Sequence, residues 1–296
     1  MTTLDANASA LKTDGGPLAV LCGGGSLPYA VAAAAAARGR RVVLFALRGW
    51  ADPARVVEFP HHWIALGQFG RFMRLAGSEG CRDLVWIGSL VRPAITQIRF
   101  DLTTLALLPR LVGAFRGGDD HLLSSLGRIF EEHGFRLLGA HDVAPQLLVP
   151  AGAVARVRPN DTQRADIVRG LAILDAIGRF DIGQAVVVAD QRCLAVEGAE
   201  GTDGLLARVA DMRQSGRIRT ASGVGVLVKA PKPGQDRRFD LPTIGPQTVE
   251  GVARAGLAGI AVIAGSAIIA ETERLIALAD RSGIFVVGVR GDGTFE

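Results

Sequence analysis

Short apolar runs of strand length alternate with longer segments of helical character in the first half of the chain. Leu18–Cys22 is such a run, an alanine-rich segment at 29–38 predicts a helix, and 41–47 predicts the next strand. A strand, a glycine loop, a helix and a second strand in this order form the opening unit of a parallel sheet. The same alternation predicts strands at 63–66, 84–87 and 135–138, and helices at 69–78, 105–115 and 121–133.

The second half resumes the alternation after a segment rich in proline and glycine. Predicted helices cover 161–178, 202–212, 248–255 and 271–282, and predicted strands cover 184–188, 193–197, 225–229, 260–263, 268–270 and 284–289, the first two as a hairpin. We therefore expect two α/β domains, at 17–145 and 161–296, joined by a linker at 146–160. Residues 1–16 are polar, lack the apolar segment of a signal peptide and predict a disordered tail.

Composition and spacing exclude several classes of protein. The formal net charge of +4 is too small to indicate nucleic acid binding, and the three cysteines lack the spacing of a disulfide framework or a zinc site. The five histidines show no metal-binding spacing, and no Gly-x-Ser-x-Gly motif indicates an esterase. The longest apolar stretch, 255–270, is short for a membrane span and is interrupted by glycines, so we expect a soluble protein.

Glycine loops follow the predicted strands of the first domain. Gly23, Gly24 and Gly25 precede Ser26 and a predicted helix, and glycine in such a place lets backbone N–H groups approach an anion. The loop is neither a complete Gly-x-Gly-x-x-Gly motif nor a phosphate-binding loop of the Walker A type, and a simple tight turn is the alternative. Two further loops, at 67–71 and 88–93, contain Gly70, Arg71 and Arg92. Together the three loops favour a nucleotide-binding crevice beyond the carboxyl ends of the strands.

Basic residues are concentrated between positions 208 and 238. Eight of them stand against two acidic residues: Arg208, Arg213, Arg217, Arg219, Lys229, Lys232, Arg237 and Arg238 against Asp211 and Asp236. A solvated face is the usual explanation of such a segment. Here the prolines and glycines at 230–245 predict an extended loop, in which lysines and arginines can converge on phosphate groups.

Carboxylates near this segment are candidate metal ligands. Glu197, Glu200 and Asp203 are spaced by three, and Thr202 is placed to cap the helix that starts there. An acidic residue in a first helical turn also stabilises the helix dipole, which is the structural alternative for Asp203. Asp240 lies between Phe239 and Leu241, an apolar setting for a carboxylate. Since Mg²⁺ needs only one or two protein carboxylates beside phosphate oxygens, Asp203 and Asp240 are the predicted magnesium ligands.

These motifs in combination resemble the LpxI-type UDP-2,3-diacylglucosamine pyrophosphatases of lipid A biosynthesis. The resemblance covers nearly the whole chain from Leu18, and its motifs lie at 23–28, 67–71, 88–93, 117–120, 139–142, 181–184, 200–203, 229–233 and 240–245. The last three are specific in combination, whereas the glycine loops alone are not. The residues before Pro17 form an extension that departs from the family pattern.

The resemblance implies a dimer with a Rossmann-like N-terminal domain on the nucleotide side and a C-terminal α/β domain that carries the acyl chains and the catalytic aspartate. It implies magnesium-dependent attack of water on the pyrophosphate, with UMP and 2,3-diacylglucosamine 1-phosphate as products. The family's aspartate before Leu-Pro-Thr-Ile-Gly corresponds to Asp240. We expect catalytic roles for Asp240, Lys229 and Lys232, and substrate binding by Gly23, Gly24, Gly25, Ser26, Gly70, Arg71, Arg92, Thr202 and Thr243.

A lipid substrate carries two further expectations. The enzyme is expected in the cytoplasm, in transient contact with the inner face of the inner membrane. An apolar pocket near Asp240 is predicted to accept the acyl chains, with 257–269, Leu205, Leu206, Val209 and Ile218 as its candidate lining. The alternative function is a non-catalytic nucleotide-sugar or dinucleotide binding protein, which leaves Asp240 and the basic loop without a role. A nucleic-acid binder is a third hypothesis, but the basic segment lacks interleaved aromatic residues.

Overall fold

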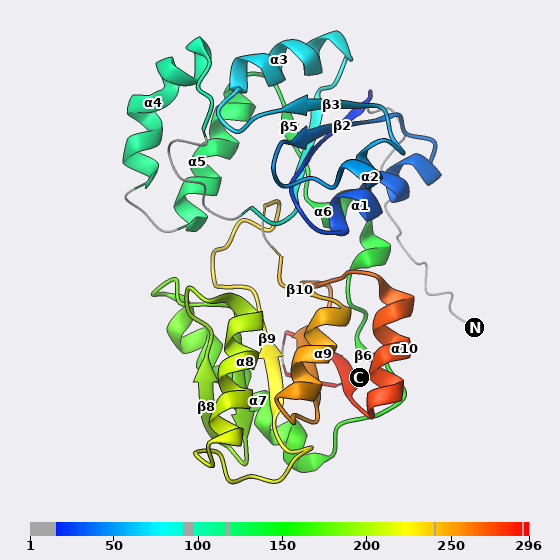
Figure 1. Ribbon diagram of the computed structural model, residues 1–296, viewed down its shortest axis with the longest axis vertical. Helices are drawn as coiled ribbons and strands as arrows, with labels where there is room; N and C mark the ends of the chain where they lie inside the picture. The colour runs from blue at the N-terminus through cyan, green and yellow to red at the C-terminus, as the bar shows by residue number, and fades with distance from the viewer. Residues whose placement is uncertain (1–15, 91–97, 116–118, 240, 292, 296) are drawn as a thin grey trace, which may run out of the picture. The chain divides into compact units, whose positions relative to one another are not determined.

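The computed structural model describes residues 16–90, 98–115, 119–239, 241–291 and 293–295, with side chains left out at 111–122. The chain divides into two compact units, which are described separately (Figure 1). The first unit comprises the residues up to Gly113 together with Ser125–Leu138. The second comprises Ala114–Ser124 and Gly139–Glu296.

A five-stranded parallel sheet forms the first unit. Its strands are β1 (Leu18–Cys22), β2 (Val42–Leu47), β3 (His61–Ile64), β4 (Asp83–Ile87) and β5 (Arg136–Leu137), in the spatial order β3-β2-β1-β4-β5. Every residue of β1 and β2 is buried. Helices cover both faces of a parallel sheet, so neither face is exposed to solvent and the strands do not alternate apolar and polar residues. The predicted Rossmann-like parallel sheet is thereby confirmed.

Helices α1 and α3 lie on opposite faces of this sheet (Figure 1). The helices of this part of the chain are α1 (Leu27–Ala37), α2 (Pro53–Val56), α3 (Phe69–Ser78), α4 (Leu102–Phe115) and α5 (Asp119–Glu132). The buried alanines of α1 let the helix backbone approach β1 and β2 closely. On the other face, Phe72 of α3 packs edge-on against Phe45 and Phe130, with ring centroids 4.8 and 5.4 Å apart.

The strand order reverses between β1 and β4, where ligands of open α/β sheets usually bind. The chain leaves β1 at Gly23 and leaves β4 at Gly88, and these two loops touch. A Cβ atom added to Gly23 would lie 2.8 Å from the carbonyl oxygen of Ser89. Glycine is therefore required at position 23 because two backbones meet there.

A six-stranded mixed sheet forms the second unit. Its strands are β6 (Gly152–Ala153), β7 (Ala185–Ala189), β8 (Arg192–Val196), β9 (Val226–Lys229), β11 (Gly259–Ile263) and β13 (Phe285–Val289), in the order β6-β13-β11-β9-β7-β8. Strands β9, β11 and β13 are parallel, whereas β6, β7 and β8 pair antiparallel with their neighbours. The predicted second α/β domain is confirmed.

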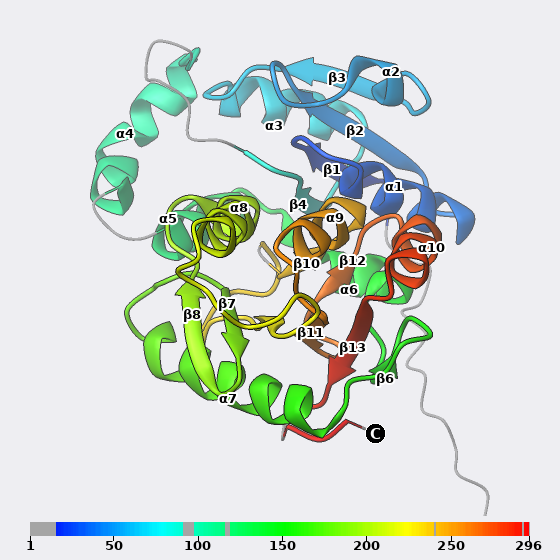
Figure 2. The same ribbon diagram turned by 60° about the horizontal axis from the view of Figure 1, so that its bottom comes forward.

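Helices cover both faces of the second sheet (Figure 2). Helix α7 (Asp161–Gly178) packs on one face, and α8 (Gly201–Gln214), α9 (Pro246–Arg254) and α10 (Thr272–Ser282) pack on the other. Side chains alternate accordingly along β9, since Val226 and Val228 join the core under α7 while Leu227 joins the core under α8–α10. The next residue of this second series is Lys229.

Four short elements escape the sequence pattern. They are α2, α6 (Ala140–Val143), β6 and β10 (Thr243–Ile244). A 3₁₀ turn, η2 (Pro145–Leu147), follows α6. Strand β10 pairs in parallel with β12 (Ile268–Ile269). Strand β6 lies within the predicted linker 146–160 and pairs with β13, so this segment groups with the second unit. No helix in the described part of the chain is long and apolar enough to cross a bilayer.

Candidate functional site

A buried lysine lies at the carboxyl end of β9. Lys229 is only 7% exposed. Its ammonium nitrogen Nζ donates hydrogen bonds to Thr202 Oγ1 at 2.9 Å and to the carbonyl oxygen of Thr243 at 3.1 Å. The alternation of β9 directs this side chain to the face that α8 covers, and Thr202 stands in the first turn of that helix. The structure thus brings together three of the residues predicted from the sequence: Lys229, Thr202 and Thr243.

Glu197, one of the three evenly spaced carboxylates of the sequence but not among the predicted magnesium ligands, completes this cluster. Thr202 Oγ1 donates to Glu197 Oε1 at 2.8 Å, and the backbone amide of Gln184 donates to Glu197 Oε2 at 2.6 Å. Glu197 is 8% exposed. An ionised carboxylate only accepts and an ammonium only donates, so the hydroxyl between them must donate to Glu197 and accept from Lys229. The sequence signal is a glutamate directly after an apolar hairpin strand.

The basic loop that follows β9 is held by its own side chains. Lys232 forms an ion pair with Asp181, and its backbone amide donates to Gln235 Oε1 at 3.0 Å. The carboxylate of Asp236 accepts from Arg238 Nη2 at 2.7 Å. This hydrogen bond is the main reason why the pKa of Asp236 lies below its ordinary value.

Several of the arginines in the basic segment have structural partners. Arg213 donates to the carbonyl oxygens of Ala255 at 2.9 Å and Ala221 at 3.1 Å, and Arg237 donates to that of Gly265. These side chains fasten loops of the second unit to one another. Some of these basic side chains therefore stabilise the fold. Fewer than the eight basic residues of the segment are available to bind phosphate groups.

Asp240 and Arg92, both predicted site residues, lie outside the described residues. The two residues after Asp240 are held by burial and hydrogen bonds. Leu241 is 7% exposed, and its carbonyl oxygen accepts from Thr243 Oγ1 at 3.1 Å. The amide of Ile268 donates to the carbonyl oxygen of Pro242 at 2.8 Å. The chain therefore continues after position 240 into buried, hydrogen-bonded residues.

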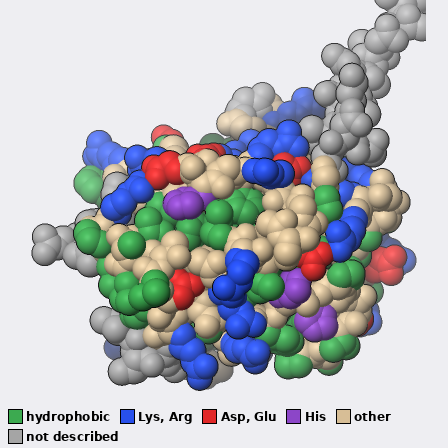
Figure 3. Space-filling model, turned by 90° about the horizontal axis from the view of Figure 1, so that it is seen from above, with side chains coloured by type: hydrophobic (Ala, Val, Ile, Leu, Met, Phe, Trp, Pro, Cys, Tyr) green, Lys and Arg blue, Asp and Glu red, His purple; other side chains and the backbone are tan. Residues whose placement is uncertain are grey.

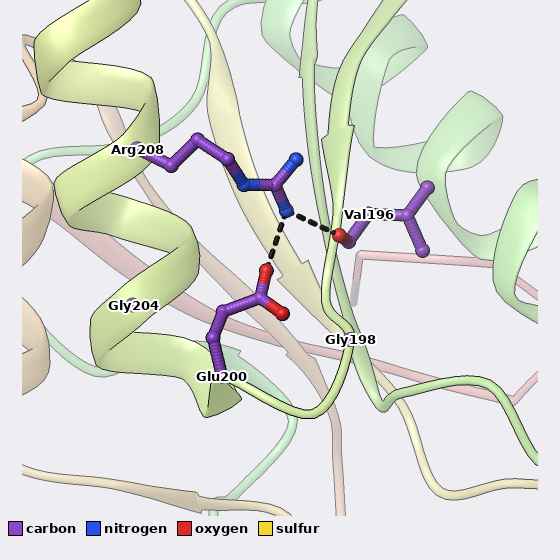
Figure 4. Close-up of a pocket in the computed structure, with 5 residues that line it drawn as sticks. All are labelled: Val196, Gly198, Glu200, Gly204 and Arg208. Carbon is purple, nitrogen blue, oxygen red and sulfur yellow. Dashed lines mark hydrogen bonds and ion pairs between the residues drawn. The ribbon is translucent and has the colours of Figure 1, made fainter.

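An open hollow of about 460 Å³ lies beside the start of α8. It is lined by Val196, Gly198, Glu200, Gly204 and Arg208. Figure 4 shows Arg208 reaching across it, where the guanidinium donates to Glu200 Oε1 at 2.6 Å and to the carbonyl oxygen of Val196 at 2.7 Å. Glu200 and Arg208 therefore neutralise one another at the rim of this hollow.

Asp203 is exposed in the first turn of α8, next to Thr202 in sequence. Within the described part of the chain, no three His, Cys, Asp or Glu side chains come together in a way that could hold a metal ion. Magnesium does not need such a set, because one or two carboxylates and phosphate oxygens suffice. An exposed carboxylate fits this chemistry, so Asp203 stays the candidate among the described residues.

The predicted acyl-chain lining is wrong for four residues. Leu205, Leu206, Val209 and Ile218 belong to the closed core between the second sheet and its covering helices, and each is at most 8% exposed. A helical stripe of apolar residues more often forms a core than a cavity, and periodicity alone does not separate the two.

In the first unit, the glycine loop after β1 is already hydrogen-bonded. The amides of Gly23 and Gly24 donate to the carbonyl oxygens of Ile87 and Ser89, each at 2.9 Å. These two N–H groups cannot serve an anion without breaking that pairing. Gly25 and the amides that open α1 at Ser26 remain the part of this loop where an anion would bind.

The loop at 67–71 is likewise braced from within. The amide of Arg71 donates to Asp101 Oδ2 at 2.9 Å, and the amide of Phe69 donates to Thr104 Oγ1 at 3.1 Å. Burial raises the pKa of Asp101, but the hydrogen bonds it accepts from the Thr104 and Arg71 amides outweigh burial and lower it. Gly70 lies in this first turn of α3, while the side chain of Arg71 is exposed and accessible to a ligand.

Apolar side chains are exposed near the start of α4. Phe100, Leu102 and Leu105 are 37%, 86% and 45% exposed. Figure 3 shows one face of the molecule, on which hydrophobic side chains and Lys or Arg side chains lie next to one another.

Comparisons with known proteins cover both halves of the chain. Residues 17–147 match the model of the LpxI N-terminal domain, and residues 150–287 match the model of the LpxI C-terminal domain. The chain is also 42% identical over 272 residues to the UDP-2,3-diacylglucosamine pyrophosphatase LpxI of Caulobacter vibrioides. This similarity covers 92% of the present chain and 97% of the relative. With both domains matched in order and with a relative of this similarity along nearly its whole length, the chain belongs to the LpxI family.

Proposed function

We propose that this protein hydrolyses the pyrophosphate of UDP-2,3-diacylglucosamine in lipid A biosynthesis. The 42% identity to the Caulobacter pyrophosphatase, spread over 92% of the chain, carries this proposal. The oxygen of a water molecule forms a bond to one phosphorus, and the bond from that phosphorus to the bridging oxygen breaks. The products are UMP and 2,3-diacylglucosamine 1-phosphate, and the protons of the water pass to the products or to solvent.

The residues of the second unit supply charge for this reaction. Lys229 offers a positive charge fixed at the end of β9, and negative charge grows on the leaving phosphate as the P–O bond breaks. Lys232, three residues later, adds a second cation that is paired with Asp181. We assign to Asp240 the orientation of the attacking water, on the family correspondence of its motif.

Magnesium is part of this proposal. Asp203 and Asp240 would hold the ion together with phosphate oxygens of the substrate, since Mg²⁺ is usually bound by one or two carboxylates. When bound, the ion would neutralise charge on the phosphates. The exposed position of Asp203 supports its access to such a ligand.

The nucleotide side of the substrate is assigned to the first unit. Gly25 and Ser26 lie in the loop after β1, and Arg71 lies in the first turn of α3, which follows β3; open α/β sheets bind ligands beyond the ends of such strands. We further propose that the enzyme is a homodimer and works at the cytoplasmic face of the inner membrane. The exposed Leu102 and Leu105 support contact with a lipid surface.

The test is release of UMP from UDP-2,3-diacylglucosamine by the purified protein. We expect UMP and the lipid phosphate in equal amounts, loss of activity with EDTA and its return with Mg²⁺. Activity that survives EDTA contradicts the magnesium assignment alone. Binding of UMP without any hydrolysis contradicts the enzyme and favours a nucleotide-sugar binding protein.

A further inference from the structure

A single hydroxyl group joins two buried charges in the second unit. Thr202 Oγ1 lies 2.9 Å from Lys229 Nζ and 2.8 Å from Glu197 Oε1. The only proton of this hydroxyl is directed to the carboxylate, and one of its lone pairs is directed to the ammonium group. The polarity of the chain of hydrogen bonds is therefore fixed by the chemical nature of its two ends.

Each member of this chain is anchored by backbone. Glu197 directly follows β8, and its second oxygen accepts from the amide of Gln184 at 2.6 Å. Thr202 stands in the first turn of α8, and Lys229 closes β9. Three separate elements thus fix the hydroxyl in space, and the hydroxyl fixes the end of a side chain with four rotatable bonds.

The choice of lysine at position 229 is specific. The sequence contains three lysines, Lys12, Lys229 and Lys232, among 33 basic residues. A lysine ammonium is a compact charge with three donors, whereas an arginine guanidinium is a wide planar fork. A buried ammonium group also requires a negative partner, because an isolated buried charge is strongly unfavourable. Glu197 contributes negative charge to this cluster through the Thr202 hydroxyl.

We propose that Glu197 and Thr202 are positioning residues that hold the ammonium group of Lys229 where the reacting phosphates bind. This inference rests on the proposed function and deepens it. Thr202 then acts through Lys229 and not as a direct binder of the ground-state substrate. Misplacing a charged group by about 1 Å is enough to reduce turnover roughly 100-fold, so loss of the hydroxyl is expected to lower kcat.

The experiment compares Thr202→Val, Thr202→Ser and Glu197→Gln with the wild-type protein in the UMP-release assay. We expect Thr202→Val to lower kcat about 100-fold with KM changed less than about threefold, because only the transition-state interaction of Lys229 is lost. Thr202→Ser keeps the hydroxyl and should restore kcat to within about threefold. Glu197→Gln keeps an acceptor but removes the charge, and should lower kcat about tenfold.

Thr220→Val is the matched control. Among the described residues, the hydroxyl of Thr220 is buried without a hydrogen-bond partner. Its replacement should leave kcat and KM unchanged. Thermal unfolding of all variants separates loss of function from loss of fold. A Thr202→Val variant that raises KM and keeps kcat overturns the inference, because Thr202 would then bind substrate directly, and so does a variant with unchanged kinetics.

A second measurement does not depend on turnover. Acetylation of Lys229 by acetic anhydride, followed by mass spectrometry, reports how firmly its amine is held in the folded protein. We expect acetylation at Lys229 to be at least about tenfold faster in Thr202→Val than in the wild type or Thr202→Ser, with Lys232 as internal reference. Equal rates at Lys229 overturn the positioning role even if the wild-type protein releases no UMP. Absence of UMP release by the wild type contradicts only the proposed function.

Discussion

The carboxylate of Asp166 accepts hydrogen bonds from both the backbone amide and the side-chain amide of Gln191, at 2.7 and 3.0 Å. Asp166 lies on α7 and is fully buried, whereas Gln191 lies in the turn between β7 and β8. Both turn residues, Asp190 and Gln191, have left-handed backbone conformations, with φ of 50° and 62°. The carboxylate thus holds a strained turn against the helix that packs on the hairpin.

Replacing this carboxylate should weaken the second unit. We expect Asp166→Ala to lower the free energy of unfolding by about 2–3 kcal/mol, because it removes charged hydrogen bonds to a turn that adopts its conformation at a cost. Asp175→Ala, at an exposed position of the same helix, should change stability by less than about 0.5 kcal/mol. Urea unfolding of the two variants measures the difference. Equal stability of the two variants would mean that the β7–β8 turn keeps its conformation without the Asp166 carboxylate.

Asp83 makes the stability of the first unit dependent on pH. It is 3% exposed and accepts from Arg136 Nε and Nη2, each at 2.7 Å, and from Arg40. Burial raises the pKa of Asp83, but the hydrogen bonds from Arg136 and Arg40 outweigh burial and lower it. The charged form is therefore favoured in the folded state.

The sign of the pH effect follows from this depressed pKa. The stabilisation is present above the ordinary aspartate value of about 4 and is lost as the pH falls through the lower folded value. We expect Asp83→Asn to cost about 2 kcal/mol at pH 7 and progressively less below pH about 4. Glu58→Gln, in an exposed pair with Arg55, should show little effect at either pH. A constant difference between wild type and Asp83→Asn across this range would contradict the assignment.

A substitution at Gly25 tests whether the loop after β1 binds the nucleotide part of the substrate. Gly25 and Gly39 have φ of 87° and 77°, and a Cβ atom at either would meet nothing within 4 Å. Valine at either position is therefore strained to a similar degree, by about 1–2 kcal/mol. Only Gly25 lies in the proposed anion-binding loop, so Gly25→Val should weaken UMP binding about tenfold while Gly39→Val leaves it unchanged. Titration calorimetry with UMP makes the comparison. Equal affinities would place the nucleotide elsewhere.

Asp240→Ala should abolish turnover and retain substrate. The family motif assigns the catalytic carboxylate to this residue, and the glycine loops and basic side chains that bind the substrate are unchanged. We expect kcat to fall at least about 1000-fold, with intact UDP-2,3-diacylglucosamine bound in the purified variant.

Asp236→Ala is the control for this variant. The carboxylate of Asp236 is engaged by Arg238, so its removal should reduce turnover by no more than about threefold. A dead Asp236→Ala beside an active Asp240→Ala would reverse the assignment. Full activity in both would remove this loop from the catalytic mechanism.

Local patterns predict the fold well where they act within one element. The apolar run at β1 and the helical segment of α7 appear with the predicted bounds, and Lys229 faces α8 because strand periodicity continues from Leu227. The two-residue strands β6 and β10 escape prediction because they exist only through pairing with distant partners, β13 and β12. Proline and glycine near them suggest a linker or a loop, yet edge pairing needs only a few backbone groups.

The candidate site shows the same difference between what local patterns predict and what long-range contacts decide. Residue type and loop position suggest Lys229, Thr202 and Thr243, but the partner of Thr202 is Glu197, which the fold brings into place from the preceding hairpin. Similarly, glycine at positions 23 and 24 suggests amides that await an anion. Those amides are instead used by β4 and its loop, more than 60 residues further along the chain. Contacts of this kind cannot be seen in a local pattern, because both partners are ordinary until the sheet assembles.

The chain between β9 and β10 begins and ends at fixed points. The amide of Ala230 donates to Gln184 at 3.0 Å, and β10 is locked in register with β12 through Thr243 and Ile268. Residues inserted or deleted between these points would change the loop without shifting the lysine before it or the threonine after it. Length variation among relatives is thus expected only at positions 234–239, because 229–233 and 240–245 carry the family motifs and the proposed catalytic Asp240.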